Sequence, residues 1–268
     1  MRSRTIFFIS DGTGITAETL GLSLLAHFSG ITFRQVRLPF TDSLEKARDF
    51  LPRVTAAQVE DGDRPILVMT IVNPEIRELF EKSGALCLDL FGTFIRPLAA
   101  EFGQVPAQAI GMARRIATEE YHDRIDAIHY SLGHDDGLTP NGLENAEVVL
   151  VGVSRSGKTP TSIYLAMQFG IRAANYPLIP EDLERMVLPG DLAQHRGKLF
   201  GLTIDPERLH RVRSERRPNS HYASLENCRK EVRDAENLMR RENIPWLDSS
   251  SRSVEEISTM ILQQMKLT

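Results

Sequence analysis

Eight consecutive residues in the second half of the chain combine the residue types with which proteins hold phosphate groups. They fit the pattern G-x-x-x-x-G-K-[ST] in full and are Gly152, Val153, Ser154, Arg155, Ser156, Gly157, Lys158 and Thr159. Glycines allow backbone N–H groups to curl around an anion, and a lysine at this position reaches the terminal phosphate oxygens. The pattern therefore predicts a nucleotide site, with Lys158 as a catalytic cation and the Thr159 hydroxyl as a ligand of Mg²⁺.

The sequence on either side of these residues suits the same chemistry. Residues 148–151 form a continuous apolar run typical of a buried strand, and residues 162–169 have the spacing of an amphipathic helix. A phosphate cradle needs this order of strand, glycine loop and helix, because the helix N-terminus adds the positive end of its dipole. Pro160 is compatible with the first helical turn, where N–H groups have no intrahelical partner. The alternative is a chance match on an ordinary strand–turn–helix unit.

Two other polar groups could act in phosphate chemistry. His134, Asp135 and Asp136 stand just before the loop and could bind Mg²⁺ or accept the proton of an attacking hydroxyl, with Asp135 or Asp136 as the catalytic base. A polar interdomain turn is the alternative for this group. Five arginines could neutralise charge on a transferred phosphoryl group or form a solvated helix face, and they are Arg208, Arg211, Arg213, Arg216 and Arg217. Asp205, at the end of the preceding strand, is a candidate carboxylate to face the metal ion.

A second glycine turn, residues 11–14 (DGTG), follows a predicted strand near the N-terminus. It lacks the full G-x-G-x-x-G spacing, so a dinucleotide site is poorly supported. Its carboxylate and hydroxyl could serve a second anion or a protein substrate. Alternatively, Asp11 or Thr13 caps the helix that follows.

The order of the predicted elements indicates the α/β class. In the first half, strands are expected at 6–10, 32–38, 66–72 and 85–90, with helices at 15–28, 43–59 and 74–82. In the second half, strands are expected at 146–153, near 173, at 198–204 and at 246–248. One helix is expected to end at residue 169, another to follow Pro206, and two more to span 225–242 and 254–265. Such alternation predicts two mostly parallel-sheet domains covered by helices. Turn residues at 133–142 divide an N-terminal α/β domain (1–140) from a P-loop kinase-like domain (141–268).

Composition narrows the protein class further. Of the 268 residues, 41% are hydrophobic and 25% are charged, which is typical of a soluble globular protein. The net charge of -4 argues against bulk nucleic-acid binding. No apolar run approaches the roughly 18 residues of a membrane span, so no membrane partner is expected. The two cysteines, Cys87 and Cys228, lie far apart, which favours a reduced, cytoplasmic setting.

Beyond the loop, motifs along nearly the whole chain resemble those of the regulatory proteins of pyruvate, phosphate dikinase and phosphoenolpyruvate synthase. They lie at residues 9–13 (ISDGT), 16–18 (TAE), 134–137 (HDDG), 164–166 (YLA), 174–178 (ANYPL), 201–209 (GLTIDPERL) and 253–257 (SVEEI). Several separate motifs in order are far more specific than a phosphate loop alone. The segments 164–180 and 198–217 look most like the bacterial phosphoenolpyruvate synthase branch.

The resemblance implies a bifunctional enzyme. Members of this family use ADP to phosphorylate a threonine next to the catalytic histidine of the target, which inactivates the target. They also remove that phosphate with inorganic phosphate as acceptor, which releases pyrophosphate and restores activity. The resemblance therefore implies phosphoenolpyruvate synthase as partner, and ADP and inorganic phosphate as co-substrates beside Mg²⁺. Residues 152–159 match the family's ADP-binding loop.

Three alternatives stay open at this point. They are the same activities on pyruvate, phosphate dikinase, an ATP-dependent small-molecule kinase, and an ADP sensor that blocks a partner without catalysis. A small-molecule kinase leaves the first domain unexplained, and the intact Lys158-Thr159 pair favours chemistry over sensing. The sequence does not fix the oligomeric state, for which a homodimer is one candidate, or whether the two reactions share one site.

Overall fold

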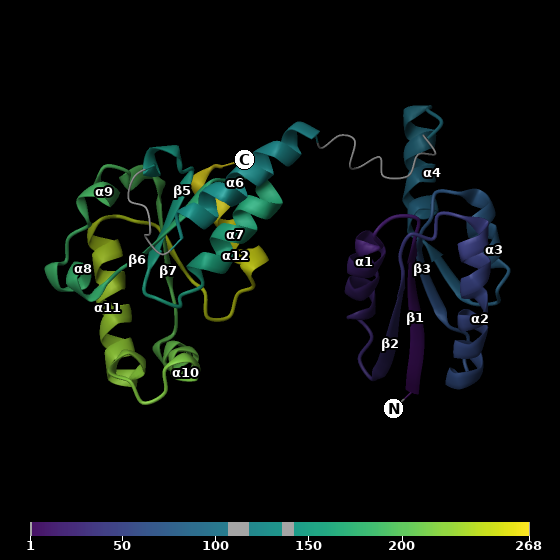
Figure 1. The fold of residues 1–268 in the computed structure, drawn as a ribbon, viewed down its shortest axis with the longest axis horizontal. Helices are drawn as coiled ribbons and strands as arrows, with labels where there is room; N and C mark the ends of the chain where they lie inside the picture. Colours follow the sequence, from purple (N-terminus) through teal and green to yellow (C-terminus); the bar gives the residue numbers. More distant parts are fainter. Residues whose placement is uncertain (1, 107–117, 136–141, 268) are drawn as a thin grey trace. The chain divides into compact units, whose positions relative to one another are not determined.

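The computed structural model describes residues 2–106, 118–135 and 142–267 (Figure 1). The chain divides into two compact units, Met1–Ile116 and Ala117–Thr268. Each unit holds one four-stranded sheet, and all strand pairs described in both sheets are parallel. This confirms the predicted α/β class with two parallel-sheet domains.

The first unit is one sheet with helices on both faces. Its strands are β1 (Arg2–Ser10), β2 (Ile31–Leu38), β3 (Ile66–Thr70) and β4 (Leu86–Asp89), and its helices are α1 (Ile15–Leu25), α2 (Leu44–Asp61), α3 (Pro74–Glu81) and α4 (Leu90–Phe102). The strand order is β2-β1-β3-β4. Because β1 lies inside the sheet, the chain leaves it to one side first and to the other side later, which places a topological switch point between β1 and β3.

Alternation along β1 builds two cores in this unit. Phe7 and Ile9 pack on one face with residues of α2 and α3, whereas Ile6 and Phe8 pack on the opposite face with Ala17 of α1. Figure 1 shows α2 and α3 on one side of this sheet and α1 on the other. A strand that is buried on both faces consists of a continuous apolar run, which is why the sequence predicts it.

The second unit repeats this strand order with more helices. Its strands are β5 (Val148–Gly152), β6 (Ala173–Pro177), β7 (Leu199–Thr203) and β8 (Trp246–Asp248). Its helices are α6 (Thr118–Gly133), α7 (Lys158–Phe169), α8 (Pro180–Arg185), α9 (Gly190–Ala193), α10 (Pro206–Arg216), α11 (Leu225–Arg241) and α12 (Val254–Met265), with short 3-10 turns η1 (Leu143–Asn145), η2 (Arg196–Lys198) and η3 (His221–Ala223). The order β6-β5-β7-β8 again places the first strand inside the sheet.

The core of the second unit positions the glycine loop. Leu150 of β5 packs with Leu165 of α7 on one face, and Val151 packs with Leu238 of α11 on the other. All four side chains are fully buried. The loop that follows β5 is therefore fixed at the carboxyl edge of the sheet, beside the switch point between β5 and β7, where open α/β sheets bind their ligands.

The two units divide before α6. This helix packs against α7, and its Ser131 hydroxyl accepts a hydrogen bond from the backbone N–H of Ala173 at 3.2 Å. The side chain of Ala127 on α6 is fully buried. The turn residues at 133–142 instead predict a first domain that ends at residue 140 and would include α6.

The sequence analysis did not predict α4. Pro97 lies in its interior and Gly92 in its first turn, and both residues are poor helix formers. Asp89 compensates by accepting a hydrogen bond from the N–H of Gly92 at 2.9 Å, which caps the helix. None of the described helices, α4 included, is long and apolar enough to cross a lipid bilayer.

Close packing of β7 against α11 at Gly201 gives a testable prediction. A Cβ atom at Gly201 would lie 2.7 Å from Cβ of Trp246 and still closer to the sulfur of Met239. We expect Gly201→Ala to lower the free energy of unfolding by about 1–3 kcal/mol, because the core must open to accept the methyl group. Urea unfolding followed by the fluorescence of Trp246, the single tryptophan, measures this change. Gly197→Ala is the control, since a Cβ atom there meets nothing within 4 Å; equal midpoints would contradict the packing argument.

Candidate functional site

The loop between β5 and α7 has the backbone of an anion cradle. Gly152, Arg155 and Gly157 have φ angles of 151°, 75° and 91°, all in the region that favours glycine. A side chain at Gly152 would collide with the carbonyl oxygen of Leu202 on β7, so the first position of the loop requires glycine. Left-handed residues within such a turn direct successive N–H groups toward one point, as in anion-binding nests.

Carbonyl oxygens of the loop accept hydrogen bonds from the groups around it. The donor–acceptor pairs are Lys158 Nζ to Gly152 O (3.0 Å) and to Val153 O (2.9 Å), Leu178 N to Gly152 O (3.0 Å), Arg213 Nη2 to Ser154 O (3.1 Å) and Ser249 Oγ to Ser156 O (2.9 Å). Because these carbonyl oxygens have donors, the turn is held in one conformation without an anion. The N-terminus of α7 adds its positive dipole end, so the site favours an anion.

Two polar side chains of the loop itself are buried. Lys158 is only 4% exposed, and a buried ammonium group must have hydrogen-bond acceptors, which the loop carbonyls provide. The Ser156 hydroxyl is fully buried and has no hydrogen-bond partner among the described residues. A phosphate in the cradle would supply oxygens to both groups, so the residues present fit the phosphate of a nucleotide.

The hydroxyl of Thr159 meets two polar side chains from other elements. It donates to Oδ1 of Asp135 at 2.9 Å and accepts from Nδ2 of Asn175 at 2.9 Å. Nδ2 of Asn175 also donates to the same oxygen of Asp135. The structure thus brings the predicted metal ligand and the predicted base together at the head of α7. Hydroxyl and carboxylate oxygens are ligands that Mg²⁺ prefers, so these residues also fit a divalent cation.

His134, the residue before Asp135, contacts Tyr130 and not the loop in the hydrogen bonds and ring contacts described. His134 stacks on the ring of Tyr130, with the ring centroids 4.0 Å apart, and its Nδ1 lies 2.8 Å from the carbonyl oxygen of Tyr130. Asp136 lies outside the described residues. Of the acidic group that the sequence singles out, Asp135 is the member that the structure places on the loop.

Arg213 is the most deeply buried of the five arginines. Its guanidinium donates to the carbonyl oxygens of Ser154 and Tyr222 at 3.1 and 3.0 Å, and it forms an ion pair with Glu231 at 2.7 Å. It also lies over the ring of Tyr222, 4.1 Å from the centroid. Since the side chain is fully buried, Arg213 connects the loop to α11 rather than to solvent.

The other arginines lie on the surface of α10 or just beyond it. The guanidinium of Arg208 donates to the carbonyl oxygen of Ser250, and the backbone N–H of Arg208 donates to the carboxylate of Asp205 at 2.8 Å. Asp205 is thus the N-cap of α10. Arg211, Arg216 and Arg217 are exposed, which leaves their guanidinium groups accessible to a ligand or a partner.

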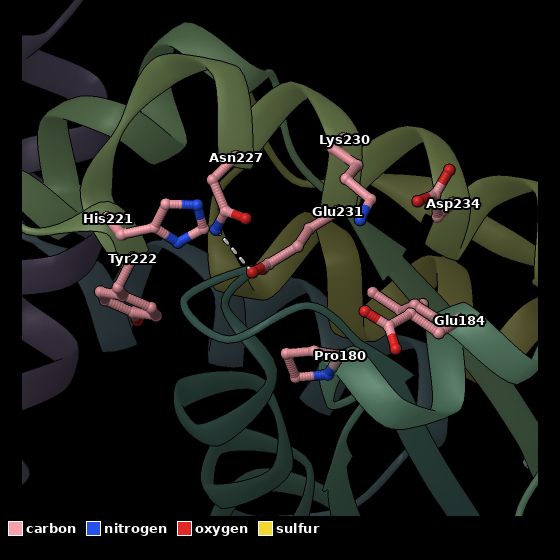
Figure 2. Close-up of a pocket in the computed structure, with 9 residues that line it drawn as sticks. Pro180, Glu184, His221, Tyr222, Asn227, Lys230, Glu231 and Asp234 are labelled. Carbon is pink, nitrogen blue, oxygen red and sulfur yellow. Dashed lines mark hydrogen bonds between the residues drawn. The ribbon is translucent and has the colours of Figure 1, made fainter.

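A hollow of about 260 Å³ opens beside the loop (Figure 2). Its walls include Pro180 and Glu184 from α8, Tyr222 from η3, and Lys230, Glu231 and Asp234 from α11. The hydroxyl of Tyr222 lies 3.0 Å from Oγ of Ser154, so the hollow adjoins the loop. Glu231 is paired with Arg213, so the carboxylates of Glu184 and Asp234 stand against the single ammonium group of Lys230, and this excess of negative charge disfavours an anion there.

The glycine turn of the first unit has a different chemistry. Asp11 is buried, and its Oδ2 accepts a hydrogen bond from the N–H of Val72 at 2.7 Å. Burial raises the pKa of Asp11 above its usual range, although the Val72 hydrogen bond opposes this shift. Gly14 is the N-cap of α1 without a side-chain hydrogen bond, so neither Asp11 nor Thr13 caps the helix. A carboxylate in this turn disfavours a second phosphate.

Sequence reasoning missed Asn175 and Tyr222 and gave Arg213 no role distinct from its neighbours. Asn175 is a buried amide within a strand, and a polar residue in a short apolar run was the available signal. No sequence signal connects Tyr222 or Arg213 to the loop, because these contacts join residues 68 and 59 positions apart.

The buried ion pair of Arg213 predicts a large stability effect. Arg213→Met would leave Glu231 without its ion-pair partner and the carbonyl oxygen of Ser154 without the guanidinium donor, so we expect a loss of about 3–5 kcal/mol in the free energy of unfolding. Urea unfolding followed by Trp246 fluorescence measures it. Arg211→Met removes an exposed arginine from the same helix and should change the midpoint little. Similar losses in both variants would show that Arg213 acts only through the charge of α10.

Comparison with known proteins identifies the family of the chain. A family model described as kinase/pyrophosphorylase matches residues 6–262. A protein of Methylobacillus flagellatus named "Putative phosphoenolpyruvate synthase regulatory protein" is 58% identical over 267 residues, which cover 100% of this chain and 98% of that protein. Proteins with the same name from Aromatoleum aromaticum and Burkholderia multivorans are 60% and 55% identical, each over 98% of this chain and over 96% and 97% of their own lengths. The chain therefore belongs to the kinase/pyrophosphorylase family.

Proposed function

We propose that the protein is a bifunctional phosphotransferase that regulates phosphoenolpyruvate synthase. One reaction uses ADP to phosphorylate a threonine of that enzyme and inactivates it, and the other uses inorganic phosphate to remove the phosphoryl group as pyrophosphate. The observation that carries the proposal is the cradle of residues 152–159, with buried Lys158 at its centre and Thr159 at the head of α7. The full-length similarity to relatives named as regulators of phosphoenolpyruvate synthase supports the choice of target.

The two reactions make the same demands on the site. In the kinase direction, the threonine oxygen bonds to the β-phosphorus of ADP, the anhydride bond to the α-phosphate breaks, and AMP leaves. In the other direction, an oxygen of inorganic phosphate bonds to the phosphorus of phosphothreonine, and the threonine oxygen leaves. Negative charge is spread over the phosphoryl oxygens in both cases, where loop N–H groups and Lys158 would neutralise it. Mg²⁺ bound at Thr159 would supply further neutralisation.

Asp135 is the candidate for the proton transfers. Its Oδ1 already accepts hydrogen bonds from Thr159 and Asn175, which orients the carboxylate at the head of α7. Its other oxygen is then available to take the proton of the attacking threonine, and the same carboxyl group would return a proton when threonine leaves. The cradle and the base thus need no rearrangement between the two directions.

The function is tested by following phosphate from ADP to protein. Phosphoenolpyruvate synthase charged on its catalytic histidine is mixed with the purified chain and ADP labelled at the β-phosphate. The proposal expects acid-stable label on a threonine, which leaves as pyrophosphate when inorganic phosphate is added. Transfer only to pyruvate, phosphate dikinase would change the target. Transfer to a metabolite, or ADP binding without transfer, would overturn the proposal.

Substitution of Lys158 tests the cradle within this assay. Lys158→Ala should lower kinase turnover by roughly 100-fold or more, because one preorganised donor to the transition state is lost. The chain should still fold, since Gly152 O keeps the N–H of Leu178 and Val153 O keeps that of Ser156 at 3.3 Å. Circular dichroism checks the fold, and Lys82→Ala, on the surface of the first unit, is the control. Unchanged turnover in Lys158→Ala would rule out the cradle as the donor site.

The hollow beside Tyr222 is where we place the protein acceptor. Glu184 and Asp234 lie on opposite walls of it and favour a basic side chain near the acceptor threonine (Figure 2). The double substitution Glu184→Gln with Asp234→Asn should raise KM for the target about three- to tenfold at low salt, and less at high salt, because partly exposed charges are screened. Glu226→Gln, on α11 but outside the hollow, is the control. An unchanged KM, or a change in the KM for ADP instead, would place the acceptor elsewhere.

A further inference from the structure

Three side chains from separate elements meet at the head of α7. Thr159 lies in the first turn of the helix, Asn175 lies in β6, and Asp135 follows α6. Both the Thr159 hydroxyl and Asn175 Nδ2 donate to Oδ1 of Asp135, and Nδ2 also donates to Oγ1 of Thr159 at 2.9 Å. The backbone holds this arrangement as well, because the N–H of Asn175 donates to the carbonyl oxygen of His134 at 2.9 Å, next to Asp135. The triangle is therefore preorganised by the fold.

The amide oxygen of Asn175 takes part in none of the three hydrogen bonds of this triangle. A carboxylate can only accept hydrogen bonds, so the Asn175 amide must turn its NH₂ group toward Asp135. Its Oδ1 then has no partner among the described residues, although the side chain is only 2% exposed. Buried amide oxygens without a partner are rare in native proteins, which points to a ligand that completes this one.

The donor set defines the class of that ligand. The site offers a hydroxyl oxygen with a remaining lone pair, a carboxylate and an amide oxygen, and it lies beside the phosphate cradle. Hard divalent cations such as Mg²⁺ prefer oxygen ligands and keep several bound waters, whereas zinc and copper prefer nitrogen or sulfur. The described residues contain no group of three or more His, Cys, Asp and Glu side chains that could hold a metal. A divalent cation beside Thr159 would therefore depend on neutral oxygen donors and on the phosphates of the nucleotide.

We propose that Asn175 is a positioning residue of a divalent-cation site, in which it and Asp135 hold the cation's water shell against Thr159. This inference rests on the proposed function, because the cation would neutralise the phosphates of ADP. The amide oxygen accepts a hydrogen bond from a cation-bound water, and the amide NH₂ keeps Asp135 and Thr159 in place. Asn175 thus acts through Thr159 and the bound waters and does not touch the transferred phosphoryl group.

The test measures cation binding directly and not through activity. The full chain is titrated with Mn²⁺, detected by electron paramagnetic resonance, both alone and with saturating ADP; the affinity for ADP is measured separately in EDTA. In Asn175→Leu, which keeps the side-chain volume, we expect Mn²⁺ binding in the ADP complex to weaken about tenfold or more, as for other groups that orient a metal's ligands. The affinity for metal-free ADP should stay within twofold.

Two further variants separate cation binding from folding. Asn175→Asp keeps an oxygen for the cation but sets a second carboxylate against Asp135, so Mg²⁺ with ADP should raise its melting temperature by more than that of the wild type. Ser131→Ala is the control, because it removes a different side-chain hydrogen bond to β6, at Ala173, and leaves the contacts among Thr159, Asn175 and Asp135 in place. It should leave Mn²⁺ affinity unchanged.

The outcomes distinguish this inference from the proposed function. Mn²⁺ affinity within twofold of the wild type in Asn175→Leu, or an equal loss of metal-free ADP binding, would overturn the inference and leave Asn175 a structural residue. Absence of Mn²⁺ binding to the wild type, with and without ADP, would also overturn it. Mn²⁺ binding that depends on Asn175 in a chain that does not bind ADP would support the cation site and refute the proposed nucleotide function.

Discussion

The pairing of the loop carbonyls with donors from other elements is the constraint on which the rest of the second unit depends. A turn of backbone can present its N–H groups to an anion only if its carbonyl oxygens find donors elsewhere. Here those donors come from α7, α10, the segment after β6 and the segment after β8, through Lys158, Arg213, Leu178 and Ser249. Each of these elements is therefore required to keep the cradle open. This explains why a charged side chain such as Arg213 is fully buried: its guanidinium is one of the donors that hold the loop.

The two units show that topology alone does not determine the chemistry. Both have their first strand inside the sheet, with a glycine turn and a helix after it. In the second unit the turn ends in Lys158, whose ammonium attracts phosphate. In the first unit the helix begins at Ile15 instead, and the turn before it carries Asp11, a buried carboxylate bound to the N–H of Val72. The two turns thus carry side chains of opposite charge, so a phosphate would be favoured in one unit and disfavoured in the other.

Much of the fold could be predicted from the sequence because the periodic signals are strong. The strand at 246–248 and the helix at 254–265 have the predicted bounds. A capping box at Ser253 marks the start of that helix. Helix α4 was missed because Pro97 and Gly92 oppose the local helical signal that its Asp89 cap restores. Local signals therefore determined both the successes and this failure.

The site was predictable only where its residues are adjacent in sequence. Residues 152–159 form a contiguous motif, whereas Asn175 and Arg213 reach the loop from 16 and 59 positions away. Their side chains are polar, and a polar side chain in a sequence is expected on the surface until a partner is known. The fold provides those partners, so the roles of Asn175 and Arg213 require tertiary structure. The predicted acidic group behaves in the same way, because only the fold shows that Asp135 meets Thr159.

The surroundings of the loop also separate the two substrates of the proposed reaction by charge. The cradle attracts phosphate through Lys158 and N–H groups, whereas the adjoining hollow presents Glu184 and Asp234 and disfavours phosphate. Tyr222 stands at the boundary, with its hydroxyl on Ser154 and its ring under the guanidinium of Arg213. A nucleotide or pyrophosphate would therefore remain in the cradle, and the hollow would stay available to a polypeptide. Because loop N–H groups recognise phosphate oxygens and not the group attached to them, the same cradle can serve as donor site in one direction and as acceptor site in the other.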